Sequence, residues 1–135
     1  MKLLIDGNIL LDVLQKREPH YPSSALIWKL CETGQAEGWV SALTFANLVY
    51  ILRRELTPDS VYDILKKLSC IFRFTDLTSG NLTAAGALRW SDYEDALQAA
   101  AAERIHANFI VTRNVRDFKA SKIPAVTPDE FLARI

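Results

Sequence analysis

The sequence has little cysteine and little histidine, and it has no excess of charge of either sign. Two cysteines and two histidines occur in 135 residues, and 16 basic residues balance 16 acidic ones. Cys31 and Cys70 lie far apart within apolar segments, so we expect two buried free thiols in a reducing cytosol. Without a close pair of Cys or His, no structural zinc site is expected. A net charge of zero argues against a protein that coats nucleic acid by bulk electrostatics, but it permits a local basic patch.

Long apolar runs, repeats and low-complexity segments are absent as well. No apolar run approaches the ~20 residues that a transmembrane helix requires, so we expect a cytoplasmic protein without a membrane contact. Half of the residues are hydrophobic, which is ample for one core. The length lies near the usual ~100–150 residues of one domain. We therefore expect residues 1–135 to form a single domain.

The hydrophobic pattern alternates between short strands and amphipathic helices. The expected strands are residues 2–5, 38–40, 71–74, 109–111 and 125–126. The expected helices are residues 8–14, 23–33, 44–56, 58–68, 82–88, 91–105 and 128–135. Short strands that are apolar on both faces and alternate with helices are typical of a parallel sheet covered on both sides. The sequence therefore predicts an α/β fold.

Acidic and amide residues occur where such a sheet would bring them together. Asp6 follows the first strand, Asn114 and Asp117 follow the fourth, and Asp92 and Asp95 open the alanine-rich helix between them. Open parallel sheets bind ligands beyond the carboxyl ends of their strands. Two carboxylates ~4 Å apart repel by about 4 kcal/mol at an effective dielectric near 20, so a cluster there needs a cation. The pattern indicates a divalent-metal site.

Each acidic residue also has a simpler explanation when it is taken alone. Asp6 suits the N-cap of the following helix, and Asp92 lies in a first turn, where the helix dipole favours negative charge. Glu94 would complete a capping box with Ser91. Asp95 is harder to explain, because small alanines on its face suit close packing against a sheet. A carboxylate there needs a partner or a proton, and a metal ion shared with Asp6 would be that partner.

A local basic stretch follows the fourth strand, formed by Arg113, Arg116, Lys119 and Lys122. Such a run is usually a solvated surface. Beside an acidic metal site it would instead hold substrate phosphates, and Arg113 and Arg116 are the candidates.

Several motifs, taken in chain order, resemble the signature of a bacterial subfamily of PIN domains. They are Asp6-Gly7-Asn8, Glu94-Asp95-Ala96-Leu97-Gln98, Thr112-Arg113-Asn114 with Asp117-Phe118, and an ending with Ile123-Pro124, Thr127-Pro128 and Phe131. The resemblance spans essentially the whole chain. It implies a three-layer α/β/α sandwich with a short parallel sheet of four or five strands. It also implies a magnesium- or manganese-dependent ribonuclease. Many small bacterial relatives are VapC-like toxins, so an RNA substrate, a cognate antitoxin and a homodimer are implied too.

The resemblance and the expected positions of the residues together assign roles to individual side chains. Catalysis would involve Asp6, Asp95, Asn114 and Asp117, and the metal ligands would be Asp6, Asp95 and Asp92. Asn8, Asn47 and Thr112 would orient these groups, and Arg113 and Arg116 would contact RNA phosphates.

The sequence departs from the family at one position. PIN nucleases usually carry a Glu on the helix after the second strand, and this chain has Asn47 there. Either Asp92 substitutes from another direction, or metal binding is weaker, or catalysis is lost. The alternative function is therefore a catalytically impaired module that binds RNA or a protein partner. A phosphatase of the haloacid-dehalogenase type also has an Asp after the first strand of a parallel sheet. It would need a second Asp two residues later as a general acid, and this chain has Asn8 at that position, so this function is disfavoured.

Overall fold

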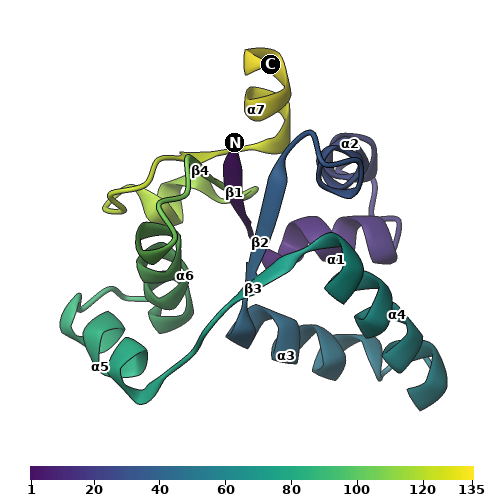
Figure 1. Cartoon of the computed structure of the whole chain (residues 1–135), viewed down its shortest axis with the longest axis horizontal. Helices are drawn as coiled ribbons and strands as arrows, with labels where there is room; N and C mark the ends of the chain where they lie inside the picture. Colours follow the sequence, from purple (N-terminus) through teal and green to yellow (C-terminus); the bar gives the residue numbers. More distant parts are fainter.

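A five-stranded parallel sheet lies at the centre of the molecule, in the order β3-β2-β1-β4-β5. The computed structural model describes all residues from 1 to 135. The strands are Lys2–Ile5 (β1), Glu37–Ser41 (β2), Arg73–Thr75 (β3), Phe109–Val111 (β4) and Ala125–Val126 (β5). Every neighbouring pair is parallel. The strand order reverses at β1, because β2 and β3 lie on one side of it and β4 and β5 on the other (Figure 1).

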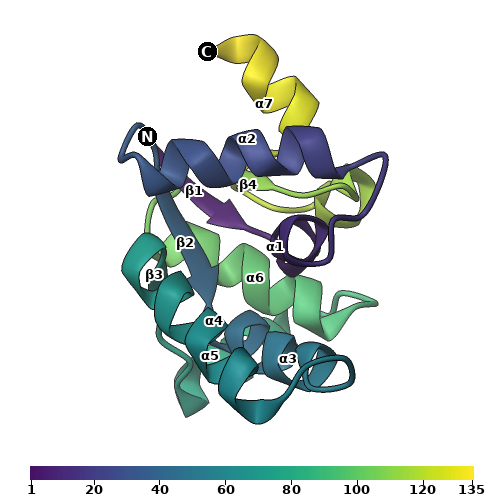
Figure 2. The ribbon, with the colours of Figure 1, turned by 90° about the vertical axis from the view of Figure 1, so that its right-hand side faces the viewer.

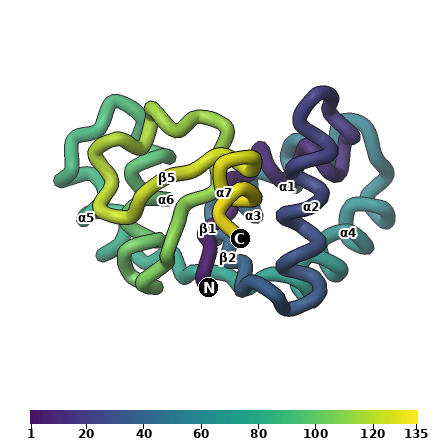
Figure 3. The backbone as a smooth tube through the Cα atoms, turned by 90° about the horizontal axis from the view of Figure 1, so that it is seen from above, coloured from purple at the N-terminus to yellow at the C-terminus, as the bar shows by residue number.

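Helices cover both faces of this sheet. They are Gly7–Leu14 (α1), Tyr21–Glu32 (α2), Ala42–Leu52 (α3), Pro58–Ile71 (α4), Ser79–Ala87 (α5), Tyr93–Arg104 (α6) and Pro128–Arg134 (α7), with a 3₁₀ helix, η1, at Val115–Phe118. Figure 1 and Figure 3 show α1, α2 and α4 on one side of the sheet and α5 and α6 on the other. The predicted three-layer α/β/α sandwich with a parallel sheet is confirmed. No helix has the length and apolar character needed to cross a membrane.

The alternation of side chains along β1 explains why both faces are covered. Leu3 and Ile5 lie in the larger core, which α1, α2, α3, α4 and α7 complete. Leu4 lies in the smaller core with Ala99 and Ala102 of α6. Successive side chains of a strand point to opposite faces of the sheet. All three residues are nevertheless fully buried, because helices cover both faces. Alanines let α6 lie close against the sheet, and Figure 2 shows it below β1, opposite α2.

One strand begins later than predicted. The strand expected at 71–74 is Arg73–Thr75, because α4 continues to Ile71. The apolar spacing of α4 extends from Leu68 to the buried Phe72, whose ring packs edge-on against Trp28. An apolar run of this kind suits the end of a helix as well as the start of a strand.

The cysteine prediction is half right. Cys31 is buried and free, as expected, and burial raises the pKa of its thiol to about 12. Cys70 is also free, but it is exposed and not buried. Its position near the end of α4 turns it away from the face that carries Val61 and Leu68.

Candidate functional site

Asp6 lies directly after β1, where the strand order reverses. Its backbone has the extended conformation of an N-cap residue, with φ −67° and ψ 144°, but its side chain makes no capping hydrogen bond. The Oδ2 atom accepts a hydrogen bond from Thr112 Oγ1 at 2.8 Å, and Oδ1 accepts one from Gln98 Nε2 at 3.3 Å. Asp6 therefore occupies the N-cap position of α1, as expected, but its carboxylate is held by the end of β4 and by α6 and does not cap the helix.

The two donors to Asp6 are buried. Thr112 is fully buried, and its Oγ1 also accepts the backbone N–H of Asn114 at 3.1 Å. Thr112 therefore contacts the Asp6 carboxylate directly from the end of β4. Gln98 is 3% exposed, and sequence reasoning gave it no role. Its position three residues after Asp95, on the same face of the helix, was the available signal.

Asp95 lies in the first turn of α6 among other carboxylates. Burial, followed by the negative charges of Asp92, Asp117, Asp6 and Glu94, raises the pKa of Asp95 from 3.8 to about 7. Asp95 has no ion-pair partner. The structure therefore brings acidic residues from three distant segments together, and none of them forms an ion pair.

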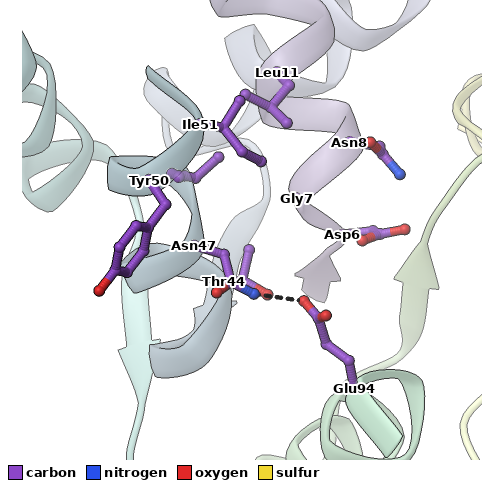
Figure 4. A pocket seen from close by; sticks show the side chains of 10 residues that line it. Asp6, Gly7, Asn8, Leu11, Thr44, Asn47, Tyr50, Ile51 and Glu94 are labelled. Carbon is purple, nitrogen blue, oxygen red and sulfur yellow. Dashed lines mark hydrogen bonds between the residues drawn. The ribbon is translucent and has the colours of Figure 1, made fainter. Parts of the chain in front are cut away.

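Two clefts open at the start of α6. The first, of about 300 Å³, is formed by α1, α3 and α6 (Figure 4). Its polar lining residues are Asp6, Asn8, Thr44, Asn47 and Glu94, and its apolar side is formed by Leu11, Leu48, Tyr50 and Ile51. The second, of about 560 Å³, lies between α6 and η1 and is lined by Trp90, Ser91, Asp92, Asp95, Arg116, Asp117, Lys119 and Ala120.

The N-terminal cap of α6 differs from the prediction by one residue. Ser91 and Glu94 do not form a capping box. Asp92 is the N-cap, and its Oδ1 accepts the backbone N–H of Asp95 at 3.0 Å. Asp92 therefore fixes the start of the helix and lines the second cleft beside Asp95. Glu94 therefore makes no capping hydrogen bond in α6.

Asn47 and Glu94 meet across the first cleft. Asn47 Nδ2 donates to Glu94 Oε1 at 2.7 Å. Figure 4 shows Glu94 rising from α6 toward Asn47, with Asp6 on the other side of the cleft. Asn8 lines the same cleft one residue beyond Gly7, and it makes no hydrogen bond to Asp6.

The residues after β4 separate into two groups. Asp117 lines the second cleft with Asp95. Asn114 is exposed at the N-cap of η1 and lines neither cleft. The structure therefore brings Asp117, and not Asn114, to the wall opposite Asp95.

The basic residues after β4 separate in the same way. Arg116 and Lys119 line the second cleft. Arg113 instead pairs with Asp12, with Nε 3.1 Å from an Oδ2 atom that also accepts a hydrogen bond from Ser24. Asp12 is fully buried and needs a counter-charge. Arg113 thus has a structural partner in place of the phosphate contact expected for it.

The donor set suits a hydrated Mg²⁺ or Mn²⁺ ion and does not form a closed metal cage. No three His, Cys, Asp or Glu side chains are placed to hold one ion together. The groups at the cleft are oxygen donors, which Mg²⁺ prefers, and this ion keeps several waters while one or two carboxylates bind it. Gln98 Oε1 is buried without a donor in the protein, although the same side chain contacts Asp6. An unsatisfied acceptor and an uncompensated acidic group both fit a hydrated cation.

These features define an α/β protein with an acidic cleft at the carboxyl edge of a parallel sheet, at its topological switch point. The PIN domain family model matches residues 2–116. The chain therefore belongs to the PIN domain family.

Solved structures share this fold at low sequence identity. A toxin-antitoxin complex from Klebsiella pneumoniae matches with a TM-score of 0.72 and 21% identity, covering 93% of this chain and 97% of that one. VapBC-1 from nontypeable Haemophilus influenzae matches with a TM-score of 0.72 and 15% identity, covering 96% and 99%. VapC20 of Mycobacterium tuberculosis, a Sarcin-Ricin loop cleaving toxin, matches with a TM-score of 0.64 and 14% identity, covering 80% and 86%. No curated protein matches the chain in sequence.

Proposed function

We propose that the protein is a Mg²⁺- or Mn²⁺-dependent endoribonuclease and the toxin of a toxin–antitoxin pair. The observation that carries the proposal is the uncompensated acidic group around Asp95, whose pKa is raised to about 7 by burial and neighbouring carboxylates. Such a group favours the binding of a cation, which would restore the ionised form of Asp95. The fold shared with a Sarcin-Ricin loop cleaving toxin supports RNA as the substrate.

Each residue of the acidic site would have a distinct role in this reaction. Asp6 and Asp95 would hold the ion directly or through its waters. A bound ion activates the attacking water and stabilises charge on the phosphate. Thr112 and Gln98 fix the orientation of the Asp6 carboxylate through their hydrogen bonds. Asp92 caps α6 and so determines where Asp95 lies.

Substrate phosphates would lie along the second cleft. Arg116 and Lys119 line it together with the acidic residues, so positive groups for the RNA backbone lie beside the proposed metal ligands. Phosphate contacts of this kind position a nucleic acid without reading its sequence. Asp117, on the same wall, would take the place of the last acidic residue of the family motif.

A protein partner completes the proposal. Similar folds occur in structures of a toxin-antitoxin complex and of VapBC-1, so we infer a cognate antitoxin and a homodimeric toxin acting on cytoplasmic RNA. Tyr50, Tyr62 and Leu26 are large apolar side chains that remain more than half exposed, at 59%, 66% and 52%, and such residues are available for a partner. Expression should arrest growth, and co-expression of a neighbouring small open reading frame should relieve the arrest.

Cleavage of a panel of RNAs by the purified protein tests the enzymatic proposal. We expect cleavage with Mg²⁺ or Mn²⁺, none with EDTA, and strong loss in Asp6→Asn and Asp95→Asn. Asp63→Asn is the matched control, since Asp63 is an exposed carboxylate on α4. Absence of cleavage by the native protein, or equal cleavage by the two site variants, would contradict the proposal.

A module that binds RNA or a protein without catalysis is the second candidate. The absence of three side chains arranged around one ion favours it. It predicts RNA binding that survives both EDTA and the Asp95→Asn change. Calorimetric titration with Mn²⁺ separates the two candidates, because only the nuclease requires binding at millimolar metal.

A further inference from the structure

The first cleft contains a carboxylate, Glu94, that was expected only to cap its own helix and not to take part in the site. Glu94 lies on one side of it and Asp6 on the other, and the remaining lining residues are all neutral. No Lys, Arg or His lines this cleft. Two carboxylates in one cleft without a counter-charge repel each other unless a cation lies between them or near them.

Glu94 is oriented but not neutralised. Its Oε1 accepts a hydrogen bond from the Asn47 amide at 2.7 Å, and it has no ion-pair partner. The Asn47 amide is neutral, so it orients the Glu94 side chain without forming an ion pair with it. A Lys or Arg in the place of Asn47 would have cancelled the negative charge of Glu94.

Glu94 does not cap α6. Asp92 makes the capping hydrogen bond of α6, and Glu94 is exposed and makes its side-chain hydrogen bond to a different helix, α3. The role of this side chain is therefore in the cleft.

A buried side chain beside Asp6 points to a ligand independently. Gln98 is 3% exposed and donates to Asp6 Oδ1. Its Oε1 is buried and has no donor in the protein. Buried polar atoms are nearly always satisfied, so an orphan acceptor on a side chain that contacts Asp6 supports a hydrated ligand beside that carboxylate.

We propose that Glu94, positioned by Asn47, is a carboxylate of the metal site and supplies from α6 the negative charge that α3 does not carry. The proposal rests on the proposed metal-dependent function. Asn47 is then a positioning residue: it acts through Glu94, and the absence of an acidic residue on α3 does not imply an inactive site.

Binding of Mn²⁺ to the full chain, measured by calorimetry and by electron paramagnetic resonance at pH 8, tests this role. We expect Glu94→Gln and Asn47→Leu each to weaken Mn²⁺ binding by about 10-fold, as supporting residues of metal sites commonly do. The matched control is Glu103→Gln, an exposed Glu at the other end of α6 that pairs with Lys122, and its affinity should equal that of the native protein.

A double variant distinguishes lost charge from lost structure. In Asn47→Asp with Glu94→Gln, the carboxylate moves to α3 and the amide to α6, so the donor and acceptor of the 2.7 Å hydrogen bond are exchanged. Most of the affinity lost in Glu94→Gln should return. Thermal unfolding in EDTA checks that every variant is folded.

The outcomes separate the two proposals. Unchanged Mn²⁺ affinity in Glu94→Gln, together with loss of binding in Asp6→Asn, would overturn the role of Glu94 and leave the metal-dependent function standing. No recovery in the folded double variant would also overturn it. An absence of Mn²⁺ binding by the native protein would overturn both proposals.

Discussion

Replacing Asp95 with Asn should stabilise the metal-free protein at pH 8. The pKa of Asp95 is raised from 3.8 to about 7, so the folded state holds this proton more tightly than the unfolded state does. The stability that the proton contributes is present below pH 3.8 and is lost as the pH rises to about 7. Asn cannot ionise, and the variant therefore avoids this loss.

The size of the effect follows from the shift and from the exposure of the side chain. The rise in the pKa of Asp95 from 3.8 to about 7 corresponds to about 4 kcal/mol, at ~1.36 kcal/mol for each tenfold change in proton affinity. Asp95 is only partly buried, so solvent screening reduces the expected gain to about 1–2 kcal/mol. This gain should be complete at pH 8 and should shrink toward pH 5.

Urea unfolding in EDTA between pH 5 and pH 8, followed by circular dichroism, measures the difference. Asp63→Asn on α4 is the control, because the same chemical change on an exposed helix surface should leave the pH profile unchanged. Millimolar Mn²⁺ should stabilise the native protein and reverse the order of the two proteins. If Asp95→Asn is no more stable than the native protein at pH 8 in EDTA, the ionised Asp95 does not destabilise the metal-free fold.

Substitutions at four further residues test the rest of the site. Thr112→Val removes the 2.8 Å hydrogen bond to Asp6 and should lower kcat/KM for RNA by about 10-fold; unchanged kinetics would show that this bond does not position the carboxylate. Arg116→Ala should weaken RNA binding and reduce the salt slope by about 1 in fluorescence anisotropy. Arg113→Ala should instead lower the free energy of unfolding by about 3 kcal/mol in urea, because Asp12 would remain buried without its counter-charge. If Arg116→Ala lowered stability and Arg113→Ala weakened RNA binding, these two assignments would be wrong. Asp92→Ala should cost about 1 kcal/mol in urea unfolding through loss of the N-cap, and Asp92→Ser should restore it.

The central acidic residues could be predicted because their positions follow from the topology. Strands that are apolar on both faces and alternate with helices define a parallel sheet, and a residue that follows such a strand must lie at its carboxyl edge. Asp6 after β1 and Thr112 after β4 obey this rule, and the two side chains are in contact. Asp95 was predictable because the alanine face of α6 left its carboxylate without a partner.

The sequence did not predict the proposed role of Glu94, because the N-cap of α6 is Asp92 and not Ser91. Ser91 and Asp92 are both good N-cap residues, and the choice between them is not decided by local sequence. Each residue turns a helix by about 100°, so a shift of one position changes the predicted role of every side chain in the first turn. With Asp92 as the N-cap, Glu94 is free to reach Asn47.

Arg113 and Gln98 could not be assigned from the sequence for a different reason. Arg113 pairs with Asp12 of α1, and only the folded sheet brings these two distant segments together. Gln98 looks like an ordinary helical residue, and its contact with Asp6 depends on how closely α6 lies against β1. Local patterns identify which residues are chemically suitable, whereas tertiary packing decides which of them meet.

Proton release on metal binding is the most direct test that the acidic group at the switch point is a cation site. Mn²⁺ is titrated calorimetrically into the protein at pH 7 in two buffers of different ionisation enthalpy. Because the pKa of Asp95 is about 7 and a metal ligand must lose its proton, binding should release about half a proton. We expect this release in the native protein and its loss in Asp95→Asn. Binding without proton release, or no binding at millimolar Mn²⁺, would contradict it.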